Sequence, residues 1–172
     1  MVTGIPQPQQ CFLSYAHHDH AAFARLHAHL GAYAKTLGFS IWADTRIAPG
    51  QYWHQRIQDE IDRSQIFVLL TTADFLNSGY ILQHEMPAIL QRHTTHGALV
   101  VPVISGPCGW QGFFGNYIQV VPVEKGRLKP VPDWRPKEKG FHAAADAVGR
   151  AVQGWFGIAP RSPFAIPGVP TP

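Results

Sequence analysis

The chain of 172 residues has the length of one domain, and its 45% apolar content allows a sizeable core. Its net charge of +3 is small and the basic residues are scattered, which argues against direct nucleic-acid binding. No apolar run is long enough to span a membrane and no signal-peptide pattern begins the chain, so the default expectation is a cytoplasmic protein. Cys11 and Cys108 form no CxxC pair and lie in or beside apolar runs, which favours buried free thiols over a zinc or redox site.

Apolar periodicity alternates between short strands and amphipathic helices along the chain. A strand at 11–15 precedes a helix that Asp19 can cap and that Gly38 ends, and a second strand follows at 39–42. The remaining elements are expected as a helix at 53–61, a strand at 66–70, a helix from a Ser78 cap to about 92, strands at 98–104 and 117–121, and a helix at 141–155.

This order predicts an α/β fold, a flavodoxin-like, doubly wound, five-stranded parallel sheet in the order 2-1-3-4-5 with helices on both faces. The domain is expected over residues 10–157, between a flexible leader at 1–9 and a Pro-rich tail or linker at 158–172 that can lead to a further domain or partner. In this topology ligands bind at the switch point between the first and third strands, at their carboxyl ends. The segments that reach this crevice are 14–19, 44–53 and 71–85.

Glu85 stands out in the last of these segments because it falls between Ile81 and Ile89 on the apolar face of its helix. An unpaired carboxylate there is costly to bury, so either a salt bridge to an arginine, a path to water or a ligand site is expected. Pro87 adds two alternatives. Either the helix kinks there, or regular helix begins late and Pro87 sits in its first turn.

Other chemistries find less support. His17, His18 and His20 have no spacing typical of a closed metal site, so no metal ligand is predicted. GxSxG, the P-loop and GxGxxG are all missing from the sequence.

An ordered series of motifs over residues 10–157 resembles TIR (Toll/interleukin-1 receptor) domains of the bacterial type. The matching segments are FLSY at 12–15 followed by Asp19, IWAD at 41–44, IAPG at 47–50 with Trp53, Ser64 with IFVLL at 66–70, FLNSGY at 75–80 leading to Glu85, and VPVI at 101–104 with Cys108 and Trp110. The sequence departs from the family in having His17 and His18 where many members carry arginine.

The resemblance implies an NAD+ glycohydrolase, which cleaves NAD+ to nicotinamide and ADP-ribose or a cyclic isomer, as the effector part of a bacterial defence or signalling protein. It assigns Glu85 as the catalytic carboxylate, and NAD+ is then the substrate with no further cofactor. Homo-oligomers that use the BB loop at 45–52 are implied as well.

Four further residues are candidates for substrate contacts at the strand ends. Tyr15 and Trp53 could form aromatic walls, and Ser14 and Asp44 could supply polar contacts. Trp53 as a helix anchor and Asp44 as a loop cap remain the structural alternatives. Tyr80, in the segment that leads to Glu85, is a further substrate-binding candidate.

Two rival functions remain open. One is a TIR scaffold that signals by self-association without turnover, and the other is a flavodoxin-shaped domain that binds a nucleotide without cleaving it. Both differ from the enzyme in not requiring Glu85 for chemistry.

Overall fold

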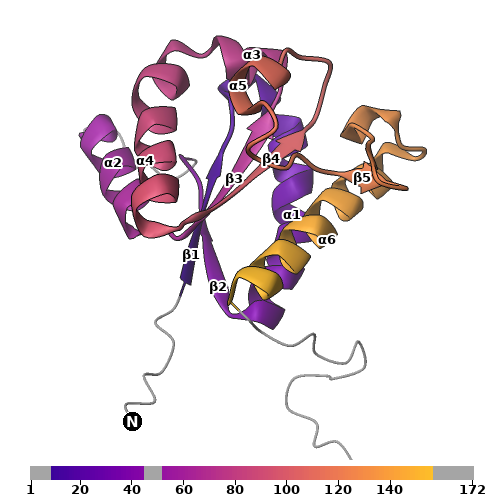
Figure 1. Cartoon of the computed structure of the whole chain (residues 1–172), viewed down its shortest axis with the longest axis horizontal. Coiled ribbons are helices and arrows are strands. Elements are labelled where there is room, and N and C mark those ends of the chain that lie inside the picture. Colours follow the sequence, from indigo (N-terminus) through magenta and orange to yellow (C-terminus); the bar gives the residue numbers. More distant parts are fainter. Residues whose placement is uncertain (1–8, 45–51, 157–172) are drawn as a thin grey trace, which may run out of the picture.

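The computed structural model describes residues 9–44 and 52–156. Four parallel strands form its main sheet: β1 (Gln9–Ser14), β2 (Phe39–Trp42), β3 (Ile66–Thr71) and β4 (Leu99–Ile104). They lie in the order β2-β1-β3-β4, so the first connection leads outward to one edge and the later ones to the other (Figure 1). This confirms the doubly wound α/β fold and the predicted order of its first four strands.

The predicted fifth strand at 117–121 is wrong in extent. Only Val121 pairs, in a single parallel bridge with Val103. It donates to the carbonyl of Pro102 at 2.9 Å and accepts from Ile104 at 2.8 Å. Pro102 has no N–H to offer a neighbouring strand, and Tyr117 is 96% exposed, so the ladder cannot extend along this edge.

Helices cover both faces of the sheet. Successive side chains of β1 point to opposite faces and therefore contact two different helix layers. Cys11 and Leu13 face the layer of α1 (His20–Leu37) and α6 (Lys137–Phe156). Phe12 faces the opposite layer, which contains α2 (Trp53–Arg63) and α4 (Met86–His96) (Figure 1). All six residues of β3 are buried, as the uninterrupted apolar run predicts for a strand covered on both faces.

Seven short elements complete the fold within the described residues. They are η1 (His17–Asp19), α3 (Ala73–Asn77), η3 (Ile81–Glu85), α5 (Gln111–Phe114), β5 (Val123–Glu124), β6 (Arg127–Leu128) and η4 (Val131–Asp133). The segment after β3 is therefore split into α3, η3 and α4, and it reaches His96 rather than the predicted residue 92.

The local signals at α1 have mixed outcomes. Gly38 ends the helix in the left-handed conformation, with φ of 80° and its N–H bonded to Ala34, which confirms that prediction. Asp19 does not cap the helix with its side chain. Its carboxylate instead accepts the hydroxyl of Thr72 at 2.5 Å, so the acid joins the segment after β1 to the residue that follows β3. Cys11 is a buried thiol as expected, whereas Cys108 is only half-buried.

Two glycines of α6 should respond oppositely to alanine. A Cβ on Gly140 would lie 2.6 Å from the carbonyl oxygen of Val131, a backbone atom that cannot turn away. A Cβ on the exposed Gly154 would meet nothing within 4 Å. We therefore expect Gly140→Ala to lower the free energy of unfolding by about 1–3 kcal/mol, and Gly154→Ala to raise it by about 0.5–1 kcal/mol. Chemical denaturation of both variants measures this difference, and equal effects would contradict the described packing.

Candidate functional site

Glu85 is the last residue of η3, a π-helical turn in which the N–H of Met86 bonds to the carbonyl of Ile81. Pro87 follows in the first turn of α4. Proline has no N–H and its ring clashes with the carbonyl four residues earlier, that of Gln83, so a wider turn is a physically reasonable solution just ahead of it. Of the two alternatives for Pro87, the second is therefore the correct one.

The Glu85 carboxylate points into the protein at the carboxyl end of β1. Glu85 is 6% exposed, and its Oε2 accepts the hydroxyl of Ser14 at 2.5 Å. Ser14 is the last residue of β1, itself 3% exposed, and is paired with Leu69 of the neighbouring β3. The contact joins residues 71 positions apart. It lies at the carboxyl end of the sheet, at the switch point between β1 and β3.

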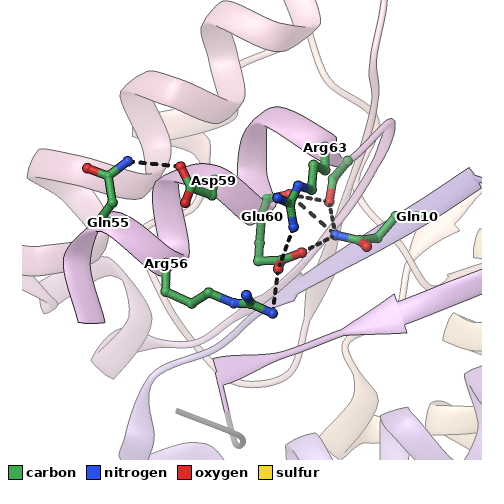
Figure 2. Close-up of polar contacts among 7 residues, drawn as sticks. Gln10, Gln55, Arg56, Asp59, Glu60 and Arg63 are labelled. Carbon is green, nitrogen blue, oxygen red and sulfur yellow. Dashed lines mark hydrogen bonds and ion pairs between the residues drawn. The ribbon is translucent and has the colours of Figure 1, made fainter. Parts of the chain in front are cut away.

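A second buried acid shows how a structural carboxylate is satisfied in this fold. Glu60 of α2 forms ion pairs with Arg56 at 2.8 Å and with Arg63 at 3.5 Å. The side-chain amide of Gln10 donates a hydrogen bond to its carboxylate at 2.8 Å, and Figure 2 shows these contacts. This cluster lies by the amino-terminal half of β1, since Gln10 is its second residue. Within the described ranges Glu85 has no cationic partner, so the predicted alternative of a salt bridge to arginine applies to Glu60 and not to Glu85.

The surroundings of Glu85 make its ionisation difficult. Burial raises the pKa of Glu85 from 4.5 to about 7 against the lowering effect of the Ser14 hydrogen bond, and the negative charge of Asp44 raises it further. At neutral pH the group therefore exists in comparable amounts as acid and carboxylate. Such a pKa suits a group that stabilises positive charge and exchanges a proton at physiological pH.

Asp44 and Trp53 are joined directly. The indole N–H of Trp53 lies 3.1 Å from Oδ1 and 3.2 Å from Oδ2 of Asp44. Burial raises the pKa of Asp44, while the bond from Trp53 and the charge of His17, 3.9 Å away, lower it. The bond ties the first residue of α2 to Asp44, and the charge of Asp44 is close enough to raise the pKa of Glu85.

Trp53 and Tyr80 form an aromatic surface near the two acids Asp44 and Glu85. Their ring centroids lie 4.1 Å apart at an interplanar angle of 40°. His54 accepts or donates a hydrogen bond at 3.0 Å with the Tyr80 hydroxyl, and the His84 ring lies 5.0 Å from that of Tyr80. Burial and then the charge of Glu85 raise the pKa of Tyr80 to about 12, so its phenol stays protonated and can donate.

Tyr15 is placed differently from the other candidates. Its ring stacks on Phe23 of α1 at 4.1 Å and 15°, with one face against the core. Burial and the charge of Asp44 raise its pKa, which places the residue within electrostatic reach of Asp44. Tyr15 therefore has a packing role in addition to any contact it makes with a ligand.

The predicted site residues thus assemble as two groups at one end of the sheet. The first is the bonded pair Ser14–Glu85, and the second joins Asp44, Trp53 and Tyr80. His54 and His84 are not predicted from the sequence, in which their only signal is that each neighbours a candidate residue. Apart from Tyr52, which is 90% exposed, the predicted loop at 45–52 lies outside the described residues.

The described ranges, residues 9–44 and 52–156, also bear on metal binding and on membrane insertion. No group of three or more His, Cys, Asp or Glu side chains is arranged there to hold a metal ion. None of the helices in those ranges combines the length and hydropathy that crossing a membrane requires.

The raised pKa of Glu85 predicts a stability change of opposite sign from an ordinary paired acid. The folded protein holds this proton more tightly than the unfolded chain, so stability falls as the pH rises from about 4.5 to about 7. We expect Glu85→Gln to match the wild type near pH 4 and to unfold at a higher temperature at pH 8, by an amount on the order of 3 kcal/mol at most. Thermal unfolding at both pH values measures this.

Glu60→Gln provides the matched control for that experiment. Its carboxylate has arginine partners, so its loss should lower the melting temperature at pH 8. A Glu85→Gln variant that is destabilised at pH 8 like Glu60→Gln would show that Glu85 is a paired structural acid.

Comparison with known proteins agrees with this arrangement. The sequence profile of the family described as TIR domain matches residues 11–128, which include every residue of the site. A protein of Sinorhizobium fredii (strain NBRC 101917 / NGR234), named uncharacterized protein y4lF, is 31% identical over 141 residues. The match covers 82% of this chain and 43% of that protein, so the chain spans less than half the length of this relative. The parallel sheet, the ordered motifs and the match over 11–128 together place this chain in the TIR domain family.

Proposed function

We propose that this TIR domain is an NAD+ glycohydrolase that releases nicotinamide and forms ADP-ribose or a cyclic isomer of it. The observation that carries the proposal is Glu85, a 6% exposed carboxylate held by one hydroxyl beside an aromatic surface. A buried acid with a raised pKa and without a cationic partner is a typical functional group, because a merely structural one is better satisfied.

The reaction needs only one carboxylate. The bond between C1′ of the ribose and the nicotinamide nitrogen breaks, and its electron pair leaves with nicotinamide, which becomes neutral. Ordinary glycosidases need a second acid to protonate the leaving oxygen, and here that requirement disappears. The ribose carries the positive charge, which the Glu85 carboxylate stabilises. Water then bonds to C1′ and releases a proton to solvent, or a nucleophile in the adenosine half bonds to C1′ and closes a ring.

The aromatic surface of Trp53 and Tyr80 supports the binding of a nucleotide. Either ring of this partly apolar surface can stack with nicotinamide or adenine, and the Tyr80 hydroxyl and the Asp44 carboxylate can contact ribose hydroxyls. The negative charge of Asp44 adds to that of Glu85 in favouring a cationic ribose over a neutral one.

Assembly is part of the proposal. We infer that copies of this domain associate, with residues 45–52 among the contacts, and that the domain is the effector part of a longer cytoplasmic defence or signalling protein. The bacterial relative, which is more than twice as long as its match to this chain, supports a multi-domain context.

The test is nicotinamide release from NAD+ by the purified domain, measured at low concentration and again with the domain crowded on a surface or fused to an oligomer. Turnover that rises with clustering and needs Glu85 supports the enzyme. Absence of turnover under forced clustering would overturn the enzyme and leave the two non-catalytic functions. Titration of a non-cleavable NAD+ analogue then distinguishes a nucleotide-binding domain from a scaffold that binds none.

A further inference from the structure

The two oxygens of the Glu85 carboxylate have different surroundings. Oε2 accepts the Ser14 hydroxyl at 2.5 Å. Oε1 has no hydrogen-bond or ion-pair partner in residues 9–44 and 52–156, and these residues do not fully enclose it. The carboxylate is thus fixed at one oxygen and available at the other.

Ser14 is well placed to fix that oxygen. It ends β1, and the alternation of that strand directs it to the same face as Phe12, toward the layer of α2 and α4. Pairing of β1 with both β2 and β3 holds its backbone. A serine in this buried row loses hydration that a residue such as Phe12 does not lose, and within the described chain its hydroxyl has Glu85 as its hydrogen-bond partner.

We propose that Ser14 is the positioning residue of the NAD+ glycohydrolase reaction, holding Oε2 of Glu85 so that Oε1 alone faces the ribose of the substrate. The inference rests on the proposed function and changes the role expected for Ser14, from a direct substrate contact to one exerted through Glu85. It also explains the orientation of a carboxylate on a π-helical turn, since the turn presents the acid and the strand fixes it.

Replacing Ser14 by alanine removes a hydrogen bond to the ionised form of Glu85. Nicotinamide release should then lose about 10- to 100-fold in kcat at pH 7, with KM changed less than about twofold. The acid limb of the pH profile should move up by about one to two pH units. Ser14→Thr, which keeps a hydroxyl, should restore the wild-type limb. A raised KM with an unmoved limb would overturn the proposal, because it would mean that Ser14 contacts the substrate.

Ser105→Ala is the matched control. Ser105 directly follows β4 and is buried, and its hydroxyl has no partner within the described residues. Its loss should leave kcat, KM and the pH limb unchanged. A shift as large as that of Ser14→Ala would show a general effect of serine removal and would count against the proposal.

A second readout needs no turnover and therefore separates failure of this inference from failure of the proposed function. The pH at which Glu85 titrates is obtained by comparing unfolding of each protein with that of its Glu85→Gln counterpart from pH 4 to 9. The same contributions from the other titratable side chains at this end of the sheet enter both comparisons, so a difference between Ser14→Ala and the wild type reports on Glu85. These side chains are Tyr15, His17, Asp19, Asp44, His54, Tyr80 and His84.

The expected result is that Glu85 titrates at a higher pH in Ser14→Ala than in the wild type, whether or not NAD+ is cleaved. An unchanged titration would overturn the positioning role. A shifted titration together with no NAD+ turnover would preserve the contact between Ser14 and Glu85 and reject the enzyme.

Discussion

Glu85→Gln is expected to reduce nicotinamide release by about 10³-fold, because a neutral amide cannot stabilise the positive ribose. Glutamine has nearly the same shape and can still accept the Ser14 hydroxyl through its carbonyl oxygen, so the site keeps its geometry. The change therefore isolates the charge. The assay compares nicotinamide formation by the clustered wild-type and Glu85→Gln domains at pH 7.5, with nicotinamide quantified by chromatography.

Two comparisons keep this result interpretable. Glu124→Gln changes an exposed acid of β5 that pairs with Lys129, and it should leave turnover unaltered. The Glu85→Gln protein should also be at least as stable as the wild type at this pH, so lost activity cannot be explained by unfolding. Retained turnover in Glu85→Gln would falsify the assignment of Glu85 as the catalytic carboxylate.

Phe67→Ala is expected to lower the free energy of unfolding by about 3–5 kcal/mol. Phe67 is fully buried in the second position of β3, and its ring centroid lies 6.2 Å from that of Phe12 on the neighbouring strand. Truncation removes apolar surface and leaves a cavity between the sheet and the layer of α2 and α4. A domain with a total stability of about 5–15 kcal/mol would lose a large part of it.

Phe113→Ala is the matched control for that loss. This residue lies in α5 and is 47% exposed, so its removal should cost less than about 1 kcal/mol. Urea denaturation of the two variants gives the comparison. Similar losses from both would mean that the main sheet does not carry the core described for it.

The parts of the fold that the sequence predicted are those in which local pattern and tertiary packing agree. The uninterrupted apolar run of β3 required burial on both faces, and the glycine at 38 required a helix end. The position of Glu85 inside an apolar arc gave its burial correctly, because Ile81 and Ile89 on either side are buried too.

Other parts depended on partners that no local pattern identifies. Tyr117–Val121 has strand-like residues, but pairing was limited by Pro102 on a different segment. Asp19 is a good capping residue whose side chain was taken by Thr72, 53 positions away. Short elements such as α3 have too few residues for a periodic signal.

The candidate site was predicted in location more than in detail. The switch-point argument brought Ser14 and Glu85 to the same end of the sheet, yet it gave no reason for a direct bond between them. Pro87 was visible as a disturbance, while the π-helical turn ahead of it was not, because two outcomes fitted the sequence equally well. The tyrosine at 15 was expected as an open wall, and its stacking on Phe23 required knowledge of where α1 lies.

The contrast between the two buried acids bears on laboratory evolution of this domain. Glu60 is held by two arginines. The buried Glu85 instead lowers the stability of the folded state as the pH rises from about 4.5 to about 7. A library selected only for heat resistance in neutral or alkaline buffer should therefore accumulate uncharged residues at 85 and retain the acid at 60. Selection that couples survival to NAD+ consumption should show the opposite preference at 85, so the two regimes would separate what folding requires from what function requires.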